Sequence, residues 1–375
     1  MIYLDYSANT PVDARVLEQF CAVERRCIGN ANSHHQAGSA AKAEIDAATI
    51  KIASLLGVQP AEIIYTSGAS EANNFALKGL ARLSRHTGRH IISTPLEHSS
   101  VSGTLTALQE QGYEIDLLDV KQDGTVDLEH LKDLLRPDTI CVAVTLVDSE
   151  LGVVQPVQEI AAILKAHPHC HLHVDATQAV GKIPVSFEGV DTMSLTAHKF
   201  YGLNGIGLLI KRRNLALEPL IHGGESTTIY RSGTPTVALA SSLACALDLA
   251  VTDLPGRVDH VAKLNAELRA ALSTYPLVRI NSPDHAIPHV LNLSVRNVKG
   301  TVFQRELDAK GVCVSVKSAC SSDGLPSRAV FAVSRDRRNA LSSWRISLSH
   351  LTTEDEIKAF LQAFDVCYRE LTAVH

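Results

Sequence analysis

Short apolar runs alternate in a regular order with helical segments through the first half of the chain. Apolar runs of strand length occur at residues 62–66, 90–93, 114–118, 139–147 and 172–175. Segments with helical spacing lie between them, at residues 72–85, 99–111, 128–135 and 157–166. Strands that alternate with helices are typical of a largely parallel sheet with helices on both faces. We therefore expect an α/β protein.

The second half of the chain is expected to hold a smaller domain. The alternation becomes less regular after Gly207, and a helical stretch at residues 237–249 precedes Pro255 and Gly256. A chain of 375 residues is also long for a single hydrophobic core. We expect a large domain over residues 14–253, and a small α+β domain that combines residues 1–13 with residues 254–375.

The charge balance argues against nucleic acid or an anionic membrane as the main partner. The chain carries 35 basic and 40 acidic residues, which gives a formal charge of −5, and it has no long block of either sign. It shows no basic leader, no apolar run of bilayer length and, among eight cysteines, no CxxC pair. We expect a soluble, cytoplasmic protein with free thiols.

A lysine and an aspartate follow two of the apolar runs. The run that starts near Asp191 ends in Thr196-Ala197-His198-Lys199, and an earlier run ends at Asp175. Ligands of α/β sheets bind at the carboxyl ends of the strands, so the amine and the acid are expected to share a cleft. A lysine can bind pyridoxal phosphate covalently while an aspartate faces the pyridine nitrogen. The alternative, a solvated Lys199 and a helix-capping Asp175, remains open on this evidence.

A small-residue turn, Ser67-Gly68-Ala69-Ser70-Glu71, joins the run at 62–66 to the next helix. Free backbone amides and the helix dipole make such a turn a binding site for anions, and Ser70 adds a hydroxyl. The alternative is an ordinary capping box without a ligand.

No metal site is predicted. His169, His171 and His173 could share one face of a strand, but no second cluster completes a tetrahedral set of ligands. Gly202, Gly205 and Gly207 follow the lysine without opening a helix, so they indicate a turn and not a dinucleotide site.

Several blocks together resemble the class V aminotransferase superfamily, and within it the cysteine desulfurases of the NifS/IscS type. The matching blocks keep the family order along almost the whole chain and lie at residues 4–13 (LDYSANTPVD), 66–71 (TSGASE), 97–98 (EH), 152–155 (GVVQ), 173–178 (HVDATQ), 198–199 (HK), 231–234 (RSGT) and 318–320 (SAC). The resemblance implies a pyridoxal-phosphate enzyme of fold type I that forms homodimers with shared active sites.

The resemblance also implies a role for each matching residue. Lys199 would bind pyridoxal phosphate covalently, Asp175 would face its ring nitrogen, and His98 would stack on the ring and move protons. Gln178 and Ser149 would contact the phenolic oxygen. The phosphate would be held by Ala69, Ser70, Thr196, His198 and, from the neighbouring subunit, Thr234.

Cys320 is the sulfur acceptor that the resemblance implies. It lies in a stretch of small polar residues at 317–325, which is typical of an exposed loop. In such enzymes the loop thiolate attacks the sulfur of cysteine, alanine leaves, and a persulfide remains for transfer to an acceptor protein, as in iron–sulfur cluster biogenesis.

Three positions depart from the family pattern. Ser149 replaces an asparagine, Thr228 stands in an altered run, and His350 replaces the arginine that binds the substrate carboxylate. We assign substrate binding to Asn32 and His350. Because an imidazole cannot form a bidentate pair with a carboxylate, a related lyase or aminotransferase acting on another amine is the alternative function. A third hypothesis is a degenerate homologue that assembles with partners without catalysis.

Overall fold

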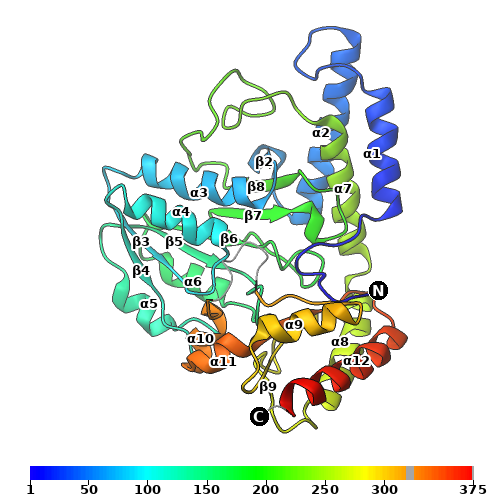
Figure 1. Cartoon of the computed structure of the whole chain (residues 1–375). Helices are drawn as coiled ribbons and strands as arrows, with labels where there is room; N and C mark the ends of the chain where they lie inside the picture. The colour runs from blue at the N-terminus through cyan, green and yellow to red at the C-terminus, as the bar shows by residue number, and fades with distance from the viewer. Residues whose placement is uncertain (318–324, 374–375) are drawn as a thin grey trace.

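A seven-stranded sheet forms the centre of the computed structural model, which describes residues 1–317 and 325–373 (Figure 1). The strand order is β2-β8-β7-β6-β5-β3-β4, and β8 alone runs antiparallel to its neighbours. The strands are β2 (Ile63–Thr66), β3 (His90–Ser93), β4 (Glu114–Leu117), β5 (Thr139–Thr145), β6 (His171–Asp175), β7 (Thr192–Thr196) and β8 (Gly207–Lys211). The expectation of a mostly parallel α/β sheet is confirmed.

Helices cover both faces of this sheet because its central strands are apolar on both sides. All seven residues of β5 are buried. Side chains of α3 and α4 form a hydrophobic cluster on one face, and side chains of α2, α6 and α7 contribute to the cluster on the other. The helices of this part are α1 (Ala14–Arg26), α2 (Gln36–Leu56), α3 (Ala69–Leu83), α4 (Ser99–Gln109), α5 (Leu128–Leu134), α6 (Val157–Leu164) and α7 (Val237–Thr252).

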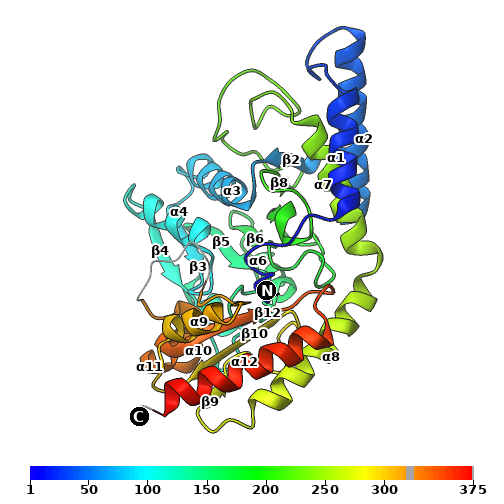
Figure 2. The ribbon, with the colours of Figure 1, turned by 45° about the vertical axis from the view of Figure 1, so that its right-hand side comes forward.

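A second, smaller sheet has the order β12-β10-β9 and is antiparallel. A separate parallel pair joins β1 to β11. Figure 2 shows these elements below the large sheet, with α8 and α12 along one side. The elements are β1 (Ile2–Tyr3), α8 (Leu254–Leu272), β9 (Val278–Ile280), β10 (Val290–Val295), α9 (Gly300–Ala309), β11 (Val312–Cys313), α10 (Arg328–Ser334), α11 (Arg337–Ser342), β12 (Ser343–Ser347) and α12 (Glu354–Thr372).

Two of the hydrophobic clusters support the division into domains that we propose from the sequence, although a smaller cluster joins the two parts through residues 96–153 and 329–340. Leu4 packs in one cluster with side chains from residues 261–367, whereas Val16 packs with side chains of the large sheet. We place the boundaries near Asp13 and Asp253. At the second boundary α7 and α8 meet at an angle of 66°, and Pro255 lies in the first turn of α8, where its missing N–H breaks no bond.

Element ends differ from expectation by up to three residues. α3 begins at Ala69, whereas the sequence indicated about 72, because the turn at Ser67 and Gly68 leads directly into the helix. Among the described residues, no helix by itself has the length and apolar composition needed to cross a membrane, although α7 and α8 meet that criterion together.

Candidate active site

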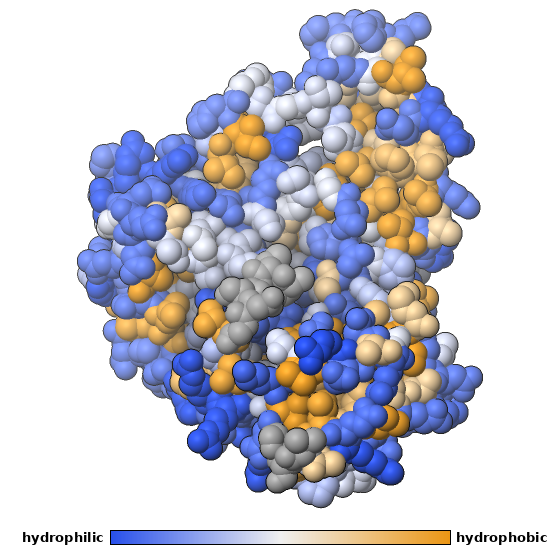
Figure 3. Space-filling model, in the orientation of Figure 1, coloured by the Kyte–Doolittle hydropathy of each residue, from blue (hydrophilic) through white to orange (hydrophobic). Residues whose placement is uncertain are grey.

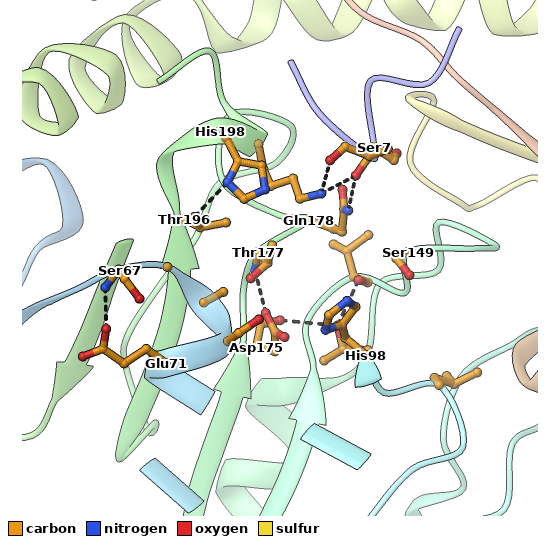
Figure 4. A pocket seen from close by; sticks show the side chains of 18 of the residues that line it. Ser7, Ser67, Glu71, His98, Ser149, Asp175, Thr177, Gln178, Thr196 and His198 are labelled. Carbon is orange, nitrogen blue, oxygen red and sulfur yellow. Dashed lines mark hydrogen bonds between the residues drawn. The ribbon is translucent and has the colours of Figure 1, made fainter. Parts of the chain in front are cut away.

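A cavity of about 290 Å³ lies at the carboxyl ends of β5, β6 and β7, under the N-terminal segment. It brings together nine of the residues selected from the sequence, namely Ala69, Ser70, His98, Ser149, Asp175, Gln178, Thr196, His198 and Lys199. Figure 4 shows how the labelled side chains from separate strands and turns converge on it. The place in the fold is the one expected for a ligand site in an α/β sheet.

Lys199 reaches the cavity from a single 3-10 turn, Ala197–Lys199, that directly follows β7. Its Nζ donates hydrogen bonds to the backbone oxygens of Ser7, at 2.8 Å, and Ala8, at 2.6 Å. The amine is therefore held by the N-terminal segment, and the alternative of a solvated surface lysine does not describe it.

Asp175 ends β6 and is almost completely buried, with 4 % of its surface exposed. Asn73 Nδ2 donates to Oδ2 at 2.8 Å, and the backbone amide of Thr177 donates to Oδ1 at 2.9 Å. Asn73 is held in turn by His173, whose Nε2 lies 3.0 Å from the Asn73 Oδ1. The carboxylate thus has a defined orientation. The sequence analysis did not select Asn73, because no pattern in α3 marks a buried amide as functional.

The turn before α3 presents backbone amides at one end of the cavity, beside Thr196 and His198. Thr196 Oγ1 lies 3.1 Å from His198 Nδ1. Burial, together with the positive charges of Lys199 and Lys182, lowers the pKa of His198 to about 4, so its imidazole is neutral near pH 7. Helix amides, a hydroxyl and an imidazole are the donors that a phosphate requires.

Gly207 permits this turn to lie against the sheet. A Cβ on Gly207 would fall 2.6 Å from the Leu195 oxygen and 2.7 Å from the Gly68 Cα. Because both neighbours are backbone atoms, no side-chain rotation could make room for the additional atom.

Glu71 also lines the cavity and binds the turn before α3, but the capping box of the alternative interpretation is not formed, because the N-cap residue is Gly68 and has no side-chain cap. Glu71 Oε2 accepts from the Ser67 amide at 2.7 Å, and its Oε1 from Arg231 Nε at 3.0 Å. Burial alone would raise the pKa of Glu71, but the hydrogen bonds from Arg231 and Ser67 outweigh it and lower the pKa below its ordinary value. The carboxylate stays ionised and holds the Ser67 amide and Arg231 beside the turn.

His98 caps α4, and its Nδ1 accepts from the Ser100 amide at 3.1 Å. Burial lowers the pKa of His98, and Lys199 and Arg328 lower it further against the opposing effect of Asp175. Ser149 lies at the cavity wall, where its backbone oxygen accepts from Arg345 at 2.7 Å. A neutral imidazole is therefore available beside Asp175 (Figure 4).

A hydrogen bond from Lys182 orients the side chain of Gln178. Its Oε1 accepts from the Lys182 ammonium at 3.2 Å, and its Nε2 donates to the Ser7 backbone oxygen at 2.9 Å. Burial, with Lys199 and Arg345 adding to it, lowers the pKa of Lys182 to about 7. Lys182 was not selected from the sequence, although a lysine one turn after a site glutamine is a signal that could have indicated it.

Arg345 is a second cavity residue that the sequence analysis did not assign to the site. It is 1 % exposed, and its Nη2 pairs with Asp5 Oδ1 at 2.9 Å. Its Nε is buried without a hydrogen-bond partner in the described part of the chain. A charged arginine inside the buried strand β12 is the sequence signal that could have indicated this role.

Four selected residues do not line this cavity. Thr234 lies in a neighbouring hollow beside Arg231, and Asn32 lies in another beside Tyr65. His350 packs against the ring of Tyr201, with 4.6 Å between ring centres. Cys320 lies outside the described residues. The roles assigned to these four residues remain predictions.

The histidines before Asp175 form no metal site in the described part of the chain, which contains no group of three metal-binding side chains. His173 Nδ1 lies 2.9 Å from Thr192 Oγ1, and its Nε2 bonds Asn73. Both ring nitrogens therefore belong to the network that holds Asp175.

The cavity residues fit pyridoxal phosphate. The hydroxyls of Ser7 and Thr177, which line the cavity, are buried and have no hydrogen-bond partner in the described structure. The cavity is also lined by the amine of Lys199, by the carboxyl group of Asp175 and by the hydrogen-bond donors at the turn before α3. The chemistry of these groups matches an aldehyde, a pyridine nitrogen and a phosphate respectively.

Comparisons with known proteins agree with this arrangement. The family model for class-V aminotransferases matches residues 2–360. The protein named cysteine desulfurase IscS from Proteus mirabilis is 40 % identical over 365 residues, which cover 95 % of this chain and 90 % of that protein. A solved NifS-like protein has a TM-score of 0.92 at 35 % identity over 99 % of both chains. A structure described as SspA in complex with cysteine has a TM-score of 0.83 at 30 % identity, and covers 94 % of this chain and all of that one.

Proposed function

Because the chain belongs to the class-V aminotransferase family, we propose that it is a pyridoxal-phosphate-dependent cysteine desulfurase that transfers the sulfur of L-cysteine to Cys320. The observation that carries the proposal is that Lys199 and Asp175 meet in one cavity, beside the anion-binding turn of α3. Relatives named cysteine desulfurase align with nearly the whole chain, which supports the same substrate.

The cofactor supplies an aldehyde that condenses with amines, and a ring that accepts electrons from the substrate Cα. Lys199 would hold it covalently, and the amides before α3 would hold its phosphate together with Ser70, Thr196 and the neutral His198. Asp175 would face the ring nitrogen and keep a proton on it, because the hydrogen bonds from Asn73 and Thr177 fix the orientation of its carboxyl group.

Two groups of this chain are placed to move protons. Lys199 Nζ and the neutral imidazole of His98 both border the cavity. We assign removal of the substrate Cα proton to Lys199. The neutral imidazole of His98 would take up a proton and deliver it to the departing product.

The sulfur step balances without an outside oxidant. The Cys320 thiolate attacks the substrate sulfur, the carbon–sulfur bond breaks, and the carbon takes up a proton, so cysteine and a thiol become alanine and a persulfide. Ser315 pairs with the cavity residue Arg345 through two backbone hydrogen bonds. Cys320 follows five residues later in the sequence, outside the described residues, and its role rests on the family resemblance.

We also propose a homodimer with shared sites and a protein acceptor for the sulfur. Thr234 lies in a hollow that shares Ser67 with the cavity, and Asn32 lies in a separate hollow. The outer side of α1 exposes Leu17 and, just beyond the helix, Ile28, the latter 87 % exposed. Figure 3 shows apolar surface along α1 and α7 on the right. Contiguous exposed apolar surface of this kind is typical of an interface.

One observation is a reason to test the alternative activity, that of a lyase or aminotransferase acting on another amine. His350 packs on Tyr201 and does not line the cavity, so its imidazole is not placed there to bind a substrate carboxylate. An enzyme that acts on a different amine would be consistent with that arrangement.

The test compares the native protein with Cys320→Ala, both loaded with pyridoxal phosphate. We expect the native protein to release alanine from cysteine and to carry a persulfide detectable by mass spectrometry. Cys320→Ala should keep the cofactor absorbance but form little alanine. Equal alanine release by both proteins would refute the role of Cys320, and turnover of another amine without turnover of cysteine would favour the alternative.

A further inference from the structure

A second cavity, of about 410 Å³, lies on the smaller sheet. It is bordered by β9, by the turn at 296–299 between β10 and α9, and by α11. It shares no lining residue with the active-site cavity. Figure 2 shows β9 and α11 close together at the lower end of the molecule.

Four cations line this second cavity: Arg279, Arg296, Lys299 and Arg338. All four are exposed, and in residues 1–317 and 325–373 none forms an ion pair. The single acid in the lining is Asp336, whose Oδ1 accepts the backbone amides of Arg338 at 2.9 Å and Asn339 at 3.1 Å. The wall therefore carries an excess of three positive charges without a matching carboxylate.

The floor of the second cavity is polar and well ordered. Asn339 Nδ2 donates to Asn281 Oδ1 at 2.9 Å, and Ser294 Oγ donates to the Asn339 backbone oxygen at 3.1 Å. Ser294, Asn339 and Ser342 are all buried. Pro276, Leu277 and Val278 form an apolar border on one side. Figure 3 shows strongly hydrophilic surface around α11, at the lower left.

We propose that this cavity binds a small phosphate ester with at least two negative charges, of the nucleoside-diphosphate class. Planar guanidinium groups pair with phosphate oxygens in a bidentate manner, and three of the four cations are arginines. The volume lies within the range of about 300 to 1,000 Å³ that is typical of small-molecule sites. The apolar border would take the uncharged part of the ligand.

An extended polyanion fits these observations less well. The chain has a formal charge of −5, and these cations are confined to one hollow and do not form a stripe across the surface. The proposal does not depend on the desulfurase activity, because the two cavities have no residue in common.

The test is calorimetric titration of the cofactor-loaded protein, so that its active-site phosphate position is already filled. Adenosine diphosphate and inorganic pyrophosphate are titrated at constant ionic strength set with chloride. We expect saturable one-to-one binding of adenosine diphosphate, with pyrophosphate competing for the same site. Arg296→Glu/Arg338→Glu should weaken the affinity at least about tenfold.

Lys121→Glu/Lys263→Glu is the matched control, because it changes the net charge equally at exposed lysines outside the cavity. It should bind like the native protein. If the cavity variant does not fold by circular dichroism, Arg296→Gln/Arg338→Gln replaces it, with the same expected loss. Absence of saturable binding, or an equal loss in the cavity variant and the control, would overturn the proposal.

Discussion

The Lys182 ammonium lies 3.2 Å from Gln178 Oε1, and this contact decides which end of the glutamine side chain faces the cavity. The Ser7 backbone oxygen can only accept, so the amide nitrogen of Gln178 faces it, and the amide oxygen accepts from Lys182. The amide nitrogen is thereby directed to the Ser7 oxygen and to the cavity. Two side chains four residues apart thus present a hydrogen-bond donor to the proposed cofactor.

Replacing Lys182 with methionine should weaken the binding of the cofactor without preventing folding. Gln178 would lose its orientation, and a hydrogen bond to a charged group contributes about 1.5–3 kcal/mol. We expect cofactor dissociation, followed by absorbance, to become about tenfold faster or more. Lys182→Arg keeps a donor and should restore most of the binding. Unchanged dissociation in Lys182→Met would show that Lys182 does not orient Gln178.

Replacing Asp175 with asparagine should abolish most activity while the cavity keeps its shape. The neutral amide removes the charge that would stabilise a protonated ring nitrogen, and electrostatic groups of this kind contribute about 100-fold or more in kcat. Kinetics with cysteine provide the measurement. Asn73→Ala, which removes one hydrogen bond to Asp175, should cause a smaller loss. Activity of Asp175→Asn within a factor of two of the native value would contradict the assigned role.

Glu97 should make the stability depend on pH. Burial raises the pKa of its carboxyl to about 8, so between about pH 4.5 and 8 the folded protein holds a proton that the unfolded chain releases. The contribution of Glu97 to the free energy of unfolding is therefore present below pH 4.5 and decreases as the pH rises to 8, by about 1 kcal/mol per pH unit within that window.

Urea unfolding of Glu97→Gln at pH 5.5 and pH 8 tests this sign. The variant should show a smaller decrease in stability between the two pH values than the native protein. Asp148, whose pKa burial raises to about 7, acts in the same direction, so Asp148→Asn is the companion variant. Identical pH dependence in the native protein and Glu97→Gln would show that Glu97 is already ionised when folded.

Replacing Gly207 with alanine should destabilise the protein and weaken its binding of pyridoxal phosphate. The new Cβ would push the Gly68 turn away from β8, at a cost of about 1–3 kcal/mol. Thermal unfolding and cofactor titration measure both effects. Gly103→Ala, in α4 with open space around its Cβ, is the control and should be neutral or slightly stabilising. Equal behaviour of the two variants would show that the close contact has no consequence.

Much of the fold was predictable because the signals are local. The run at 90–93 coincides with β3, and the run at 114–118 matches β4 to within one residue, since apolar residues between turn residues specify a strand over such short lengths. The ends of α3 and α7 were less predictable, because packing sets the last turn of a helix.

The sequence by itself determined the α/β class, the positions of Lys199 and Asp175 at strand ends and the turn of small residues before α3, since each depends on residues close together in the chain. Only the tertiary structure brought Ser7, Asn73 and Arg345 to the site, and it placed His350 against Tyr201 instead. Those contacts join residues about one hundred or more positions apart and depend on how β6, β7 and β12 pack. Such relationships arise from packing, which no short sequence pattern encodes.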